Sequence, residues 1–140
     1  MTWDIDPAVA TAQLQATIAL ADTGPGTARI RLYTNAWPGA GDPGQPAQAE
    51  IVLGKPCASV SGGVLSFNLA AEPGGLVMTA GIPRWARWVS ASGARIADGT
   101  VTDDAHGGDF RISGGSTPPG EDRPMLLAGS LAVLTGSSLS

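Results

Sequence analysis

From residue 24 onward, glycine and proline interrupt the chain so often that only short regular elements fit between them. The 140 residues include 20 glycines and 11 prolines. The segments between these breakpoints are rich in Val, Ile, Leu and Thr, which are residues that favour strands. The sequence therefore predicts an all-β domain with many turns, and its length is that of one domain.

One segment before these breakpoints has the pattern of an α-helix, over about residues 7–22. Asp6 is placed to cap it, Pro7 suits the first helical position, and apolar residues recur at helical spacing as far as Leu20. Gly24 and the Pro-Gly pair after it end the pattern. We expect this helix to pack on one edge or face of a sheet.

The later segments are predicted strands at the spacing of a β-sandwich or barrel. Residues 27–34 alternate cleanly, with Ile30 and Leu32 on the face that we expect to be buried. Residues 125–136 form the longest apolar segment, which we interpret as a central strand bent at Gly129. The other predicted strands are residues 49–55, 62–70, 75–81, 84–91, 94–101 and 109–114, with a hairpin turn at Ser92–Gly93.

Two tryptophans three positions apart lie in the first strand of that hairpin. In a strand, Trp85 and Trp88 point to opposite faces of the sheet. We expect Trp85 and Val89 to face the core, an assignment that places Arg87 on the same face and requires a partner for its charge. In the reverse assignment, Ala86 and Trp88 form the core face.

The chain is poor in the groups that catalysis and metal binding need. It has one His and one Cys, and no hydrolase, zinc or phosphate-loop motif occurs. Cys57 cannot form an intrachain disulfide, and we expect it to be a small buried residue. We predict no enzymatic activity and no cofactor. One polar cluster is interpreted as a solvated loop, which is favoured over a metal site. If the protein is an enzyme instead, the residues of this cluster should line a pocket. The cluster comprises Asp98, Asp103, Asp104, His106 and Asp109.

Charge and the N-terminal sequence limit the partners and the compartment. The formal net charge of -4 argues against binding to nucleic acid phosphates. The first residues carry acids where a signal peptide needs a basic start, and no apolar stretch approaches the ~18 residues of a membrane span. We therefore expect a soluble protein that is made in a cytoplasm and binds neither nucleic acid nor a membrane.

What remains is a binding role carried by surfaces, and the aromatic residues are the candidates. Tryptophan is enriched at interface hot spots as well as in cores. Trp37 lies in a Pro- and Gly-rich loop, and with Trp88 and Tyr33 it is a candidate for a partner interface. A carbohydrate-binding module is one alternative, since it stacks exposed tryptophans on sugar rings; it predicts that Trp37 and a hairpin tryptophan share an exposed face.

The hairpin also carries a resemblance. Its pattern comprises Trp85, Arg87, Trp88, Val89, Gly93, Ile96, Asp98, Gly99, Thr100 and Val101. It resembles small structural proteins of tailed bacteriophages and prophages, over roughly residues 7–135. The sequence departs from that pattern at Met78–Thr79 and by an insertion over residues 116–125.

Within that group, the chain is most similar to the jelly-roll cement (decoration) proteins, such as that of a short-tailed Bordetella phage. The resemblance implies a single β-sandwich domain over residues 1–140, with many copies on the outside of an icosahedral capsid. There it would bridge neighbouring major capsid proteins and associate with itself as a homodimer, so that its final location is the virion surface. A phage tail or head–tail protein is the nearest alternative.

Overall fold

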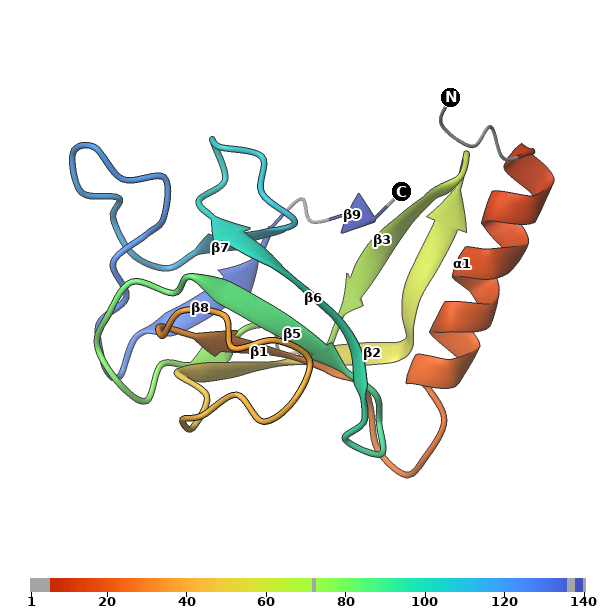
Figure 1. Ribbon diagram of the computed structural model, residues 1–140, viewed down its shortest axis with the longest axis horizontal. Coiled ribbons are helices and arrows are strands. Elements are labelled where there is room, and N and C mark those ends of the chain that lie inside the picture. Colours follow the sequence, from red (N-terminus) through yellow and green to blue (C-terminus); the bar gives the residue numbers. More distant parts are fainter. Residues whose placement is uncertain (1–5, 72, 136–137, 140) are drawn as a thin grey trace.

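The chain folds as an all-β protein with one N-terminal helix, as predicted (Figure 1). The computed structural model describes residues 6–71, 73–135 and 138–139. Within this part of the chain, no helix is long and apolar enough to cross a membrane. The helix is α1 (Pro7–Ala21), and the strands are β1 (Arg29–Tyr33), β2 (Ala49–Ser61), β3 (Val64–Leu69), β4 (Gly75–Leu76), β5 (Trp85–Val89), β6 (Arg95–Thr102), β7 (Phe110–Ser113), β8 (Leu131–Leu134) and β9 (Ser138–Leu139).

The strands form one strongly curled sheet in the order β4-β8-β7-β6-β5-β1-β2-β3-β9. Neighbouring strands are antiparallel except β6 and β7, which are parallel. The curl brings the β4 end of the sheet back against β2, where the Met78 amide donates to the Gln48 carbonyl at 2.8 Å. A side chain at Gly75 would lie 2.2 Å from the carbonyl oxygen of Glu50, so this close approach requires glycine.

The concave face of the sheet holds the core. Trp88 and Ala86 belong to it, together with Ile30 and Leu32 of the neighbouring strand β1. The predicted Trp85–Val89 core face is therefore wrong and the reverse assignment holds, because Arg87 shares the Trp85 face and finds its charge partner there. The largest fully buried side chains are Trp88, Ile30, Leu32, Ile51, Leu53, Leu65, Ile112 and Leu126.

Helix α1 stands beside the β2–β3 hairpin at one end of the molecule (Figure 1). It begins as the sequence predicts, with the Asp6 carboxylate accepting from the Ala8 amide at 2.9 Å and Pro7 in the first turn. Ile18 and Ala21 are its buried residues. The carbonyl of Ala21 accepts from the Ala91 amide at 2.8 Å, which joins the end of the helix to the β5–β6 hairpin.

Three predicted strands differ in the structure. The predicted strand over residues 75–81 is a strand only over Gly75–Leu76. Strand β2 runs through Pro56, where the sequence predicts a break, and its register against β3 shifts between Leu53 and Ala58. The predicted central strand over residues 125–136 is described as far as residue 135, and this part does not form one long strand: β8 covers only Leu131–Leu134 and lies second from the end of the sheet. The chain turns at Gly129, whose φ of 86° is left-handed. The predicted hairpin turn at Ser92–Gly93 is confirmed.

Candidate functional site

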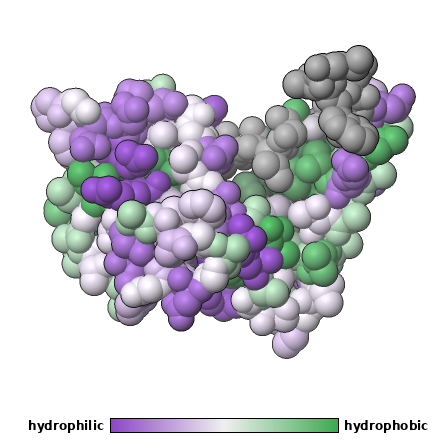
Figure 2. Space-filling view, viewed as in Figure 1, coloured by the Kyte–Doolittle hydropathy of each residue, from purple (hydrophilic) through white to green (hydrophobic). Residues whose placement is uncertain are grey.

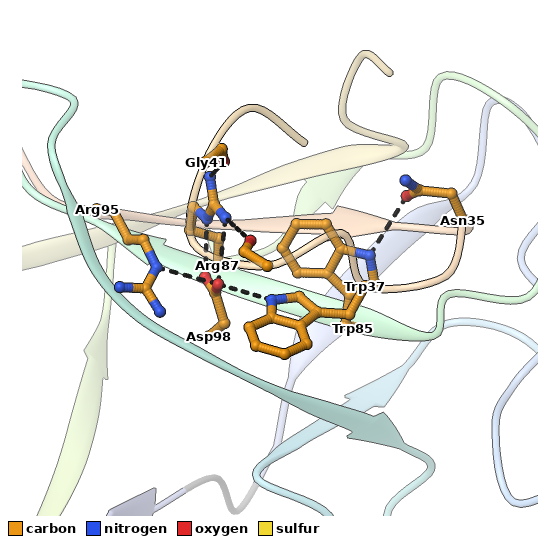
Figure 3. Close-up of polar contacts among 8 residues, drawn as sticks. Asn35, Trp37, Gly41, Trp85, Arg87, Arg95 and Asp98 are labelled. Atoms are coloured by element: carbon orange, nitrogen blue, oxygen red, sulfur yellow. Dashed lines mark hydrogen bonds and ion pairs between the residues drawn. The ribbon is translucent and has the colours of Figure 1, made fainter. Parts of the chain in front are cut away.

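The loop of residues 34–48 lies on the outer face of β5 and β6 and is fastened there by one arginine (Figure 3). Arg87 of β5 donates to the carbonyl of Gly41 at 2.8 Å and to that of Gly39 at 3.1 Å. The indole N–H of Trp37 donates to Asp98 of β6 at 2.9 Å. Trp37 is thus held above the sheet at a defined position, although more than half of the residue is exposed.

Beneath the loop lies a buried ion pair. Arg87 and Asp98 are register partners on β5 and β6, with 2.7 Å from Nε to Oδ1 and 3.1 Å from Nη2 to Oδ2. Their side chains are only 8% and 6% exposed, so little water competes for either charge. Arg95 adds a third donor through its Nε, at 3.0 Å from Oδ2. This bidentate geometry is the strongest form of an arginine–carboxylate contact.

The pKa of Asp98 reflects these contacts. Burial alone would raise it, but hydrogen bonds from Arg87, Trp37 and Arg95 outweigh burial and hold the pKa below the ordinary value. The same pair raises the pKa of Arg87, chiefly through its hydrogen bond to Asp98. Both groups therefore stay charged at neutral pH.

Aromatic rings complete the floor of the site. Trp85 stacks on Tyr33 with ring centroids 4.4 Å apart, and the Arg87 guanidinium carbon lies 5.2 Å from the Trp85 ring centroid. The indole N–H of Trp85 donates to Asn35 at 3.3 Å. Stacking and the cation–π contact both fix the Trp85 ring from below the loop.

Between Trp37 and the sheet is an open, mostly apolar pocket of about 440 Å³. Asp109, in the loop before β7, forms one wall, where its carboxylate accepts from the Thr100 amide and hydroxyl at 3.0 and 3.1 Å. The lining residues are Trp37, Trp85, Arg95, Asp98, Gly99, Thr100 and Asp109. The volume lies within the range of small-molecule sites, roughly 300–1,000 Å³, and the lining combines two indole rings with four polar side chains.

The three predicted interface residues differ in their exposure. Trp37 is at the surface and forms a wall of the pocket. Trp88 and Tyr33 are 1% and 3% exposed, so their side chains present no surface to a partner in this structure. The shared face expected of a sugar-binding module is present in part, because Trp37 and Trp85 line one pocket while Trp85 itself is 3% exposed.

The predicted acidic cluster is dispersed. Asp98 and Asp109 belong to the pocket, whereas Asp103 binds His106 and Thr117, both at 2.6 Å. Asp104 accepts from the Thr135 hydroxyl at 3.0 Å. Among the residues that the structure describes, no group of three or more His, Cys, Asp or Glu is arranged to hold a metal ion.

A second surface, which the sequence did not reveal, lies along the β4 and β8 end of the sheet. Leu76 and Leu131 are register partners there, and Met78 follows Leu76 on the same face, with Val77 buried between them. With Leu127, these side chains are each more than half exposed; we call the four of them the β4–β8 patch. The sequence signal for this surface is the position of Leu76 and Met78 on either side of Val77, which puts them on the opposite face from Val77. Residues 75–81 are one of several short apolar segments, so this pattern alone does not show that the face is exposed.

Comparisons with known proteins add no family to this description. The chain matches no protein-family model, and neither characterised proteins nor solved structures show significant similarity to it. A function for the chain is therefore inferred from its sequence pattern, its fold and its surfaces.

Proposed function

We propose that the protein is a non-enzymatic cement (decoration) protein of a tailed bacteriophage, which binds the outside of the capsid and bridges neighbouring major capsid proteins. The sequence resemblance suggests this role. The observation that supports it is the presence of exposed apolar side chains on α1 and along β4 and β8, elements that lie toward opposite ends of the longest axis of the molecule (Figure 1). A protein that joins two neighbours needs two such contact surfaces.

The first surface is the outer side of α1. The helix contains no charged residue, and its Val9 and Leu20 are exposed. Figure 2 shows green and pale residues with purple ones among them over this helix, whereas purple, hydrophilic residues gather over the loops at the other side of the view. Gln13 and Gln15 are the polar residues among the exposed side chains of the helix, and an outer side that exposes Val and Leu and carries no charge favours cover by a partner in an assembly.

The second surface is the β4–β8 patch. Its four apolar side chains lie beside β4, which is the last strand at that end of the sheet. Exposed apolar side chains that gather at one end of a sheet favour contact with another protein through burial of apolar area. On a capsid, repetition of such contacts supplies avidity that one contact lacks.

The jelly-roll relation belongs to this proposal as well. The curl of the sheet, which brings the β4 end back against β2, is the feature that supports a relation to the jelly-roll. Superposition on an experimental structure of a phage cement protein tests this relation. A shared strand order over most of the sheet is expected, and an unrelated order would contradict it.

Mass spectrometry of virions from the phage that encodes the chain tests the role directly. We expect the protein in purified heads at a copy number comparable to that of the major capsid protein. Enrichment in tails would instead favour the tail or head–tail alternative, and absence from particles would overturn a virion role. Heads that lack the protein should release DNA at a lower temperature.

Surface variants test the bridging geometry. We expect Leu20→Ser on α1 and Met78→Ser in the β4–β8 patch each to abolish heat protection when added to heads that lack the protein. Val52→Thr is a matched control, because Val52 is an exposed β-branched residue on β2 outside both surfaces. Equal protection by all three variants would contradict the proposal.

A further inference from the structure

The pocket beneath Trp37 has a feature that suits ligand binding and that the bridging role does not require, namely an aromatic ring held in a fixed position. Trp37 offers an exposed indole ring at the mouth of the pocket, yet its N–H is committed to Asp98. Asp98 is in turn fixed by Arg87 in the buried ion pair. The ring is therefore held in place without a ligand, which lowers the entropic cost of binding against it.

The polar groups around the ring can both donate and accept hydrogen bonds. Arg95 uses its Nε for Asp98, and within the described residues neither of its Nη groups has a partner (Figure 3). The Asp109 carboxylate and the Thr100 hydroxyl, which also line the pocket, lie side by side. Donors and acceptors in one pocket suit a ligand that carries several hydroxyl groups.

The charges of the site select a neutral ligand. Two guanidinium groups, of Arg87 and Arg95, stand against two carboxylates, of Asp98 and Asp109. Because these charges cancel, a phosphate or a carboxylate would gain no net attraction, and one placed beside Asp109 would be repelled. An aromatic face beside such balanced polar groups matches a pyranose ring, whose C–H face is apolar and whose edge bears hydroxyl groups.

We propose that the pocket between Trp37, Arg95 and Asp109 binds a neutral sugar residue of a polysaccharide or glycan, stacked on Trp37. This site lies on the outer face of β5 and β6, apart from α1 and the β4–β8 patch. The inference is therefore independent of the capsid role. A protein that fails to bind capsids can still bind sugar, and the reverse is equally true.

Tryptophan fluorescence and saturation-transfer NMR with soluble oligosaccharides test the proposal. The probes are cellopentaose, maltopentaose and chitopentaose, each at up to about 10 mM, a range that detects millimolar binding. We expect saturable binding of at least one of them. Trigalacturonate and a sugar phosphate form the anionic arm, and a proline-rich decapeptide forms the peptide arm.

Two variants with a matched control assign the binding to this pocket. Trp37→Ala should weaken binding by at least about tenfold, as truncation of a central aromatic contact does. Arg95→Met removes the donors and one hydrogen bond to Asp98, but Asp98 keeps its two bonds from Arg87 and the one from Trp37, so the variant tests the site even if Trp37→Ala disturbs the loop. Arg84→Met is its control, because Arg84 is an exposed arginine outside the pocket lining.

Binding that is lost in both pocket variants and kept in Arg84→Met would support the proposal. Three results would overturn it: no saturable binding by any neutral probe, tighter binding of the anionic or peptide probes, or binding that persists unchanged in Trp37→Ala and Arg95→Met. Circular dichroism of each variant confirms that loss of binding is not loss of fold.

Discussion

Arg87 and Asp98 face each other across the β5–β6 pair as register partners, with 2.7 Å between Nε and Oδ1. This contact neutralises the charge of Arg87, which is buried on the same strand face as Trp85. It also connects the hairpin to the loop of residues 34–48, because Arg87 binds two loop carbonyls and Asp98 accepts from the Trp37 indole. One ion pair thus positions both the loop and the pocket wall.

Replacing Asp98 by Asn should destabilise the protein strongly. The substitution leaves the Arg87 charge buried without its counter-ion, a change that costs about 3–5 kcal/mol. Urea unfolding measures the loss as a lower midpoint at an unchanged slope. The matched control is Glu50→Gln, since Glu50 pairs with Arg31 at 2.8 Å but its side chain is 38% exposed. That pair should contribute less than about 1 kcal/mol, and equal losses in the two variants would contradict a structural role for the buried pair.

The return of β4 onto β2 leads to a second prediction. Gly75→Ala should destabilise the protein by about 1–3 kcal/mol or more, because the new Cβ would lie against the Glu50 carbonyl and force the strands apart. Gly41→Ala is the control: no atom lies within 4 Å of its added Cβ, and we expect a change within about 0.5 kcal/mol. Thermal unfolding followed by circular dichroism compares the two, and a neutral Gly75→Ala would argue against the closed curl of the sheet.

Local patterns predicted the parts of the fold that local chemistry determines. The Asp6 cap with Pro7 marks the start of α1, and alternation around Ile30 and Leu32 marks β1. The hairpin turn at Gly93 follows from the need for a left-handed residue. In each case the deciding interactions lie within a few residues in the sequence, so the sequence alone carries them.

The candidate site depended on contacts that such patterns do not encode. Trp37 meets Asp98 across 61 positions of the chain, and only the strand register places Arg87 opposite Asp98. The position of Arg87 on the same strand face as Trp85 indicated that its charge needed a partner, but several aspartates in the sequence could have been the counter-ion. The predicted core face of β5 is wrong for the same reason: both faces of the strand are buried, and the sequence does not show that the loop of residues 34–48 covers the face that carries Trp85 and Arg87.

The single histidine provides a pH-dependent prediction. Its contact with Asp103, 2.6 Å from Nδ1 to Oδ1, raises the pKa of His106 above its ordinary value of 6.5, with a smaller contribution from Asp122. Since the folded state binds this proton more tightly than the unfolded state, the stabilisation is fully present below pH 6.5 and is lost as pH rises through the folded pKa.

An NMR titration of the His106 ring protons measures that pKa without overlap, because the chain has one histidine. Asp103→Asn should return the pKa toward 6.5, since the hydrogen-bonded carboxylate is its main cause. Asp104→Asn is the control, because Asp104 binds Thr135 instead of the imidazole. An unchanged pKa in Asp103→Asn would show that the contact does not form in solution.

Cys57 should be inert in the native protein and reactive once the chain unfolds. Burial raises the pKa of the thiol to about 12, and the neighbouring Asp22 carboxylate, which accepts from the Cys57 amide at 3.1 Å, contributes to this rise. Because only the thiolate attacks a disulfide reagent, the lower thiolate fraction alone slows labelling by roughly a thousandfold at pH 8.

Labelling with an aromatic disulfide reagent, followed by absorbance, tests this in native buffer and in urea. The chain has one cysteine, so the signal needs no assignment. Asp22→Asn serves as the comparison: it keeps a side-chain oxygen for the Cys57 amide but removes the negative charge, and the native labelling rate should rise while remaining far below that of the unfolded chain. Rapid stoichiometric labelling of the folded wild-type protein would contradict the packing of α1 and its C-terminal Asp22 over β2, since that packing is what removes Cys57 from solvent.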